Sequence, residues 1–148
     1  MASSVRTHDP SGATEPSRPR RYAFTGYRWL LLAFLLAGCA QVFLAGLGAF
    51  RLDHLDASPD VAFAPHRAVG FTMGGVALVI FILALISRPG VRAIVASAVL
   101  FLLAFLAQSL LASLADHTVI FGGLHALDGV LILGIAGYLY ARSRRREA

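Results

Sequence analysis

Four long apolar runs constrain this 148-residue chain more than any other feature of its sequence. A helix needs about 20 predominantly apolar residues to cross the hydrocarbon core of a bilayer. Four stretches reach roughly this length, and polar or turn-forming residues separate them: Trp29 to Phe50, Ala68 to Ile86, Ala93 to Ala115 and Ile120 to Tyr140. Only 14% of the residues are charged, against about 25% in a soluble domain. We therefore expect an integral membrane protein.

The breaks between the runs are short, so neighbouring helices should be antiparallel. The sequence predicts an all-α, up-down-up-down four-helix bundle that occupies residues 29–141. Its helices are expected at about 29–50, 66–87, 92–115 and 119–141. Residues 1–28 are rich in Arg, Pro and Ser and predict a disordered tail, and residues 142–148 predict a second, basic tail.

Arginine placement predicts the orientation of the bundle. All 13 basic residues are arginines, and most lie before the first run, between the second and third, or after the fourth. Positively charged flanks are retained in the cytoplasm. We expect a multi-pass protein of a bacterial plasma membrane with both termini cytoplasmic. Its expected partners are the lipid bilayer and a membrane protein or a second copy, and nucleic acid is not expected because no arginine-rich folded face is predicted.

The stretch LLAGCAQ, residues 35–41, offers a competing interpretation of the first run. It resembles the lipobox of bacterial lipoproteins, in which the chain is cut before a cysteine, here Cys39, that then takes lipid. Lipoproteins usually continue with a polar tether, whereas this chain continues VFLAGLGAF. Cleavage would destroy a complete spanning helix, so the uncut helix is the favoured reading.

The two halves of the chain resemble one another. AGCAQVFLAGLG in the first run aligns with AFLAQSLLASLA in the third, and this alignment pairs the only two glutamines, Gln41 and Gln108. Each half then gives a histidine followed four residues later by glycine, as HRAVG and as HALDG. We interpret the chain as two parallel copies of a two-helix unit.

This repeat places His66 and His125 at similar depth, near the outer ends of the second and fourth helices. These helices lie diagonally across an up-down bundle, so the two histidines are expected to face each other. Glycine follows each histidine one turn later, at Gly70 and Gly129. Each histidine therefore heads a face of small residues.

Our main hypothesis is that His66 and His125 are the axial ligands of a b-type haem. A ligating imidazole must be neutral, and a nearby helix N-terminus disfavours its protonation. Gly70 and Gly129 would let a flat macrocycle lie close to the backbone. Arg67 is placed to pair with a haem propionate.

Asp128 is expected beside this site. A carboxylate within the membrane is costly and is normally turned inward and paired. Asp128 is suitably placed to orient a histidine or to pair with Arg67. The corresponding position of the first copy is Val69, so the role of Asp128 would be asymmetric.

The segment QVFLAGLGAFRL, followed by a loop and HRAVG, resembles one half of the haem A synthase family and, more loosely, cytochrome b561-type bundles. That resemblance implies a membrane haem module for electron transfer or haem handling. The synthases carry a catalytic glutamate three residues before the second-helix histidine, where this chain has Phe63, and they have two four-helix modules. Haem A synthesis itself is therefore not implied. The chain is also similar to a family of small uncharacterised four-helix membrane proteins of high-GC bacteria, which supplies no function.

Two other functions remain open from the sequence. The chain could be a non-enzymatic membrane subunit or scaffold, with structural histidines and with Gln41 and Gln108 in interhelical hydrogen bonds. It could instead be a small transporter or quinone-reactive protein that uses Asp128 as a proton-linked group. No nucleophile with a base at usable spacing, phosphate loop, CxxC or HExxH occurs, so an enzyme is not favoured.

Overall fold

The computed structural model describes residues 17–145, and these fold into helices joined by short turns. In chain order the elements are α1 Arg18–Leu55, α2 Pro59–Ala62, α3 Ala64–Ser87, α4 Val91–Phe101, the π-helix η1 Leu102–Ala107, α5 Gln108–Ala115 and α6 Val119–Arg144. The segments α4, η1 and α5 follow one another without a break. With these three taken as one rod, the described part of the chain has four helices long and apolar enough to cross a membrane. This composition and architecture are typical of a multi-pass membrane protein.

The helix ends follow from local sequence chemistry. Pro19 lies in the first turn of α1, where its missing N–H costs no hydrogen bond. The turn between α3 and α4 uses two positive φ angles, 50° at Arg88 and 105° at Gly90. Glycine is suited to the second of these because it has no Cβ. Thr118 caps α6, since its hydroxyl accepts a hydrogen bond from the backbone N–H of Ile120.

The expected tails are partly helical, so the predicted domain bounds need correction. Residues 1–16 and 146–148 lie outside the described residues. Within the described range, α1 begins at Arg18 rather than near residue 29, and α6 continues to Arg144. The reason is packing, because Ala23, Tyr27 and Ser143 are buried against neighbouring helices. The two helix ends that extend past the apolar runs also contain arginines, among them Arg18, Arg20, Arg21, Arg142 and Arg144.

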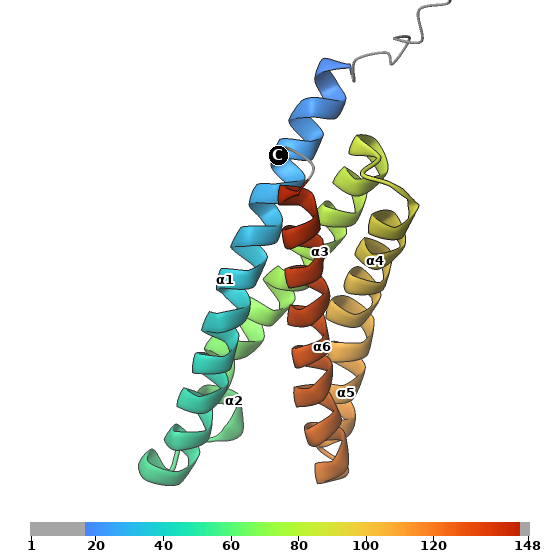
Figure 1. Ribbon diagram of the computed structural model, residues 1–148. Helices are drawn as coiled ribbons and strands as arrows, with labels where there is room; N and C mark the ends of the chain where they lie inside the picture. Colours follow the sequence, from blue (N-terminus) through green and yellow to red (C-terminus); the bar gives the residue numbers. More distant parts are fainter. Residues whose placement is uncertain (1–16, 146–148) are drawn as a thin grey trace, which may run out of the picture.

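The long helices form a four-membered bundle (Figure 1). α1 packs against α3 and α6, and the α4–η1–α5 rod packs against the same two helices. α3 and α6 therefore lie diagonally. A buried cluster drawn from all four helices forms the core: Tyr27, Leu31, Phe34, Met73, Ala77, Ile80, Ala84, Ala93, Leu100, Ile132, Ala136 and Leu139.

Buried residues recur at matching intervals in the two halves. In α3 they include Met73, Ala77, Ile80 and Ala84, and in α6 they include Ile132, Ala136, Leu139 and Ser143. In α1 they include Tyr27, Leu31 and Phe34, and in α4 they are Ala93, Ser97 and Leu100. Corresponding helices thus present the same face to the core.

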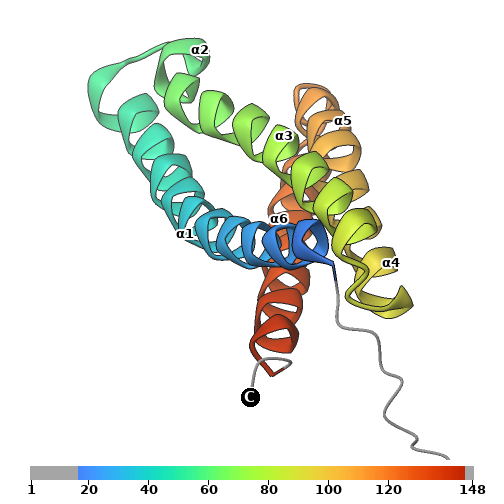
Figure 2. The same cartoon turned by 90° about the horizontal axis from the view of Figure 1, so that it is seen from above.

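Most of the core lies toward one end of the bundle. At that end are the start of α1, the turn between α3 and α4, and the end of α6. Toward the other end, which carries α2 and the turn between α5 and α6, η1 and α5 contain no buried residue. Figure 1 shows the α1 and α3 pair diverging from the α5 and α6 pair toward this end, and Figure 2 shows the same separation from above. His66 and His125, the candidate ligands, lie toward this loosely packed end of the bundle.

Candidate functional site

His66 and His125 lie together between the diagonal helices α3 and α6. Their ring centres are 6.1 Å apart and their planes are inclined at 62°. Both side chains are half-buried. The proximity that equal depth in the bundle predicts is therefore found, and the two imidazoles come from segments far apart in the chain.

A matching backbone contact orients each ring. His66 Nδ1 lies 3.2 Å from the carbonyl oxygen of Gln41, and His125 Nδ1 lies 3.2 Å from the carbonyl oxygen of Gln108. A carbonyl can only accept, so the proton of each neutral ring is on Nδ1. The Nε2 lone pair of each histidine is then free to bind a ligand.

The glutamine side chains lie against the glycines that follow the histidines. A Cβ built at Gly70 would lie 3.0 Å from Gln41 Nε2, and one built at Gly129 would lie 3.6 Å from Gln108 Nε2. Gln108 Nε2 also donates to the carbonyl oxygen of His125 at 3.0 Å. The interhelical hydrogen bond predicted for Gln108 is thereby confirmed. The glycines make room for glutamine amides.

One polar oxygen of each half is buried without a partner among residues 17–145. These atoms are Gln41 Oε1 and Asp128 Oδ2. Asp128 is only 6% exposed, and its polar neighbours include the Gln108 side chain and the His125 ring. A buried oxygen without a hydrogen bond costs about 1–3 kcal/mol. Such a cost next to the histidines marks this region as a candidate binding site.

Arg67 forms an ion pair with a carboxylate other than Asp128. Its guanidinium pairs with Asp60 of α2, 3.4 Å from Oδ1, and also donates to the backbone oxygen of Asp60. The predicted pairing of Arg67 with Asp128 is therefore wrong. The cause is α2, a short helix that the sequence interpretation treated as loop and that brings a carboxylate back to the start of α3.

Phe63 closes the outer side of His66. Its ring centre lies 6.3 Å from that of the imidazole, in an edge-on arrangement. A Cβ built at Gly48 would lie 2.5 Å from the Phe63 ring. Gly48 is thus the residue that lets the ring pack against α1.

The candidate site residues proposed from sequence omitted Gln41 and Gln108. Both had been assigned to helix packing, yet their backbone oxygens hold the two histidines. The sequence did contain a signal for this role. Gln41 and Gln108 align with each other when the two half-sequences are compared, as His66 and His125 do.

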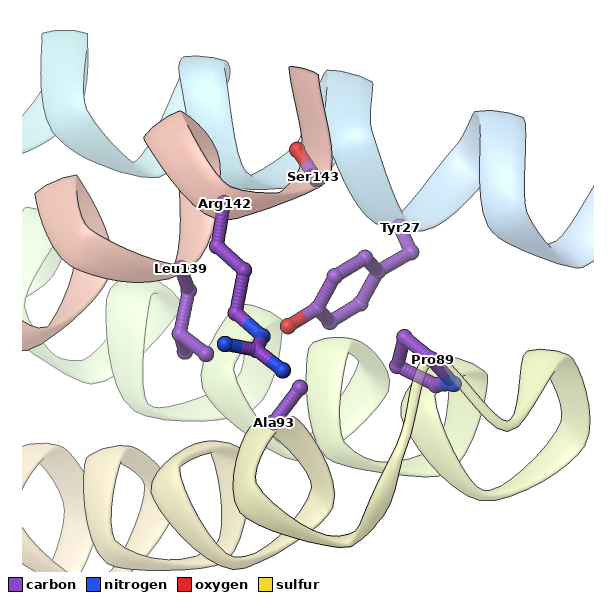
Figure 3. Close-up of a pocket in the computed structure, with 6 residues that line it drawn as sticks. All are labelled: Tyr27, Pro89, Ala93, Leu139, Arg142 and Ser143. Carbon is purple, nitrogen blue, oxygen red and sulfur yellow. The ribbon is translucent and has the colours of Figure 1, made fainter. Parts of the chain in front are cut away.

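A second polar cluster lies at the opposite end of the bundle. Figure 3 shows Tyr27 and Arg142 extending toward one another between Pro89, Ala93, Leu139 and Ser143. The space between these residues is too small for a water molecule. The Tyr27 hydroxyl contacts the Ser97 hydroxyl at 3.2 Å. This cluster ties helices together and leaves the histidine pair as the candidate binding site.

A sequence profile described as a family of unknown function, DUF6220, matches residues 41–115. The match covers about half of the chain and includes Gln41, His66 and Gln108, and it ends before His125. No curated protein and no solved structure matches the chain. The chain belongs to the DUF6220 family, a family of unknown function.

Proposed function

We propose that this protein is a membrane haem module in which His66 and His125 are the axial ligands of one b-type haem. The observation that carries the proposal is the paired geometry of the two rings. The ring centres lie 6.1 Å apart, and the Nδ1 atom of each ring contacts a backbone carbonyl oxygen of a neighbouring helix. Metal-ligating histidines commonly donate their other ring N–H in this way, which fixes the ring and raises its basicity.

The ring spacing suits a metal between the histidines. With a metal about 2.0 Å from one nitrogen of each imidazole and a ring radius of about 1.1 Å, the ring centres would lie about 6.2 Å apart. The observed distance is 6.1 Å.

The number of protein ligands favours haem over a bare metal ion. Among residues 17–145, no group of three or more His, Cys, Asp or Glu side chains is placed to hold a metal ion. A zinc site needs three or four protein ligands. A haem iron takes four nitrogens from its macrocycle and needs only the two histidines from the protein.

The surroundings also support a flat cofactor. The half of the bundle around the histidines has few buried side chains, and η1 and α5 contain none. The expected opening at Gly70 and Gly129 is not found, because the side-chain amides of Gln41 and Gln108 cover these glycines. Arg67 and the exposed Asp60 form an ion pair near the start of α3, and such a pair can open to let the guanidinium bind a propionate.

We also propose that the bundle is an up-down-up-down pair of parallel two-helix repeats with both termini cytoplasmic. Support comes from the equal spacing of buried residues in α3 and α6 and from the equal histidine–carbonyl distances. A pseudo-twofold axis between the repeats would place equivalent histidines on either side of one ligand.

A haem in this position supplies one-electron chemistry. The protein's own contribution would be to hold the two imidazoles through the carbonyl oxygens of Gln41 and Gln108 and to place them between apolar helices. Electron transfer or haem handling is the function this arrangement supports best.

Absorption spectroscopy of the detergent-purified protein from haem-replete cells tests the proposal. We expect a Soret band and a pyridine haemochrome spectrum of b-type haem at one haem per chain. His66→Ala and His125→Ala should each remove most of the bound haem. His54→Ala and His117→Ala are matched controls, because both residues are exposed, and these variants should retain the spectrum.

The folded state of each variant is checked by circular dichroism and size-exclusion chromatography. Colourless wild-type protein that also fails to take up added haemin would overturn the haem proposal. In that case the histidines would be structural, as in a scaffold subunit. Retention of a full haem complement by both alanine variants would overturn the ligand assignment.

A further inference from the structure

A groove between α4 and α6 lies on the outside of the bundle, away from the histidines. It encloses about 570 Å³, and its surface is almost entirely apolar. Val95 and Val99 of α4 form one wall, and Gly134, Ile135 and Tyr138 of α6 form the other. Arg92 lines the end that lies beside the turn between α3 and α4.

Gly134 creates the depth of this groove. A Cβ built there would meet no atom within 4 Å, so the missing side chain leaves open space. From Arg92 to Val99 the helix rises about 10 Å. That is most of the roughly 15 Å depth of one hydrocarbon leaflet. The groove is therefore long enough to follow much of one acyl chain.

The charge at the mouth of the groove has one sign. Among residues 17–145 no carboxylate pairs with Arg92. The segments 91–101 and 132–144 contain no acidic residue, and Asp53, Asp56, Asp60 and Asp116 lie near the opposite end of the bundle (Figure 1). An anionic group near Arg92 would meet attraction with no competing acid on either wall.

We infer that this groove binds one anionic phospholipid, with its phosphate at Arg92 and an acyl chain along Val95, Val99 and Gly134. Basic sites between spanning helices recognise anionic head groups, and a tyrosine such as Tyr138 is favoured at the level of the head groups. The site is distinct from the histidine pair, so its occupancy is independent of haem.

Native mass spectrometry of the full-length protein in mild detergent tests this site. The protein is titrated separately with phosphatidylglycerol and with phosphatidylcholine of the same acyl chains. We expect phosphatidylglycerol to bind about fivefold more tightly, equivalent to about 1 kcal/mol for one arginine near an anionic lipid. Arg92→Gln should remove this preference, whereas Arg144→Gln, outside the groove, should leave it.

A second pair of variants tests the groove itself. Gly134→Leu should fill the apolar wall and lower the binding of both lipids. Gly137→Leu is the matched control, because Gly137 has equally open surroundings but does not line the groove. Circular dichroism confirms that each variant is folded.

Three results would overturn the inference. The first is equal binding of the two lipids by wild-type protein, and the second is a preference that survives Arg92→Gln. The third is a dimer mass for the wild-type protein and a monomer mass for Gly134→Leu, because a second copy of the chain would then occupy the groove.

Discussion

At the scale of single residues, the contact between Tyr27 and Ser97 is the clearest polar link between helices in the core. The hydroxyl oxygens lie 3.2 Å apart, and both residues are almost fully buried. Ser97 also donates to the carbonyl oxygen of Ala93. Hydrogen bonds between helices in membranes stabilise by about 0.6–1.7 kcal/mol. We expect Ser97→Ala to destabilise the protein by that amount in detergent unfolding experiments.

Ser109→Ala is the matched control for this change. Ser109 makes the same bond to its own helix, to the Phe105 carbonyl oxygen, but is exposed. A double-mutant cycle with Tyr27→Phe isolates the contact, because Tyr27 has further interactions. A Ser97→Ala cost no larger than that of Ser109→Ala would show that the hydroxyl contact contributes nothing.

Side-chain contacts could be predicted where a sequence motif occurs twice. They could not be predicted where an unexpected element, here α2, supplies the partner. The matching motifs HRAVG and HALDG were enough to predict that His66 and His125 meet. The partner of Arg67 was not predictable, because it depends on the path of the turn before α3. The backbone oxygens of Gln41 and Gln108 contact the histidines, whereas their side chains lie against the glycines. The backbone contacts could not be predicted from the residue types and required the structure.

At the scale of elements, the π-helix η1 distinguishes the α4–η1–α5 rod from α1. From Phe34 to Gln41 there are seven positions, and from Leu100 to Gln108 there are eight. A π-helix absorbs one extra residue while the helices on either side keep their faces. The turn Leu102–Ala107 thus lets Leu100 face the core while Gln108 still faces His125.

Deletion of one residue within η1 is therefore expected to be mild. Removing Leu106, which is exposed, should leave a continuous α-helix with both faces preserved and with thermal stability close to wild type. Removing Val95 shortens the same rod equally but turns Ser97 and Leu100 by about 100°. We expect this second deletion to lower the melting temperature strongly. Equal losses from the two deletions would contradict the role of η1.

Helix existence and helix length were predictable to different degrees. The apolar runs predict four spanning helices, and residues 17–145 contain four helices long and apolar enough to cross a membrane. The ends of α1 and α6 lie further out than hydropathy indicates, because Ala23, Tyr27 and Ser143 are buried there and arginine is a good helix former. The π-helix leaves no hydropathy signal, and only the comparison of the two halves reveals its extra residue.

At the scale of the whole molecule, one end of the bundle is packed and the other is open. Tyr27, Leu31 and Phe34 contribute to the packed end, whereas η1 and α5 have no buried residue. The packed end of the bundle therefore contributes most of the buried core, and the open end contains the candidate site. Strained or unsatisfied groups such as Asp128 are tolerated where a rigid part of the same bundle holds them in place.

The orientation that we propose from the placement of the arginines can be tested directly. In a Cys39→Ser background, which removes the only cysteine, single cysteines are introduced at the exposed positions Ser58, Asp116 and Arg145. Because arginine-rich flanks stay in the cytoplasm, a membrane-impermeant maleimide should label positions 58 and 116 in intact spheroplasts. Position 145 should react only after permeabilisation. Labelling of 145 from outside, with protection of 58 and 116, would reverse the bundle and place the histidine pair toward the cytoplasm.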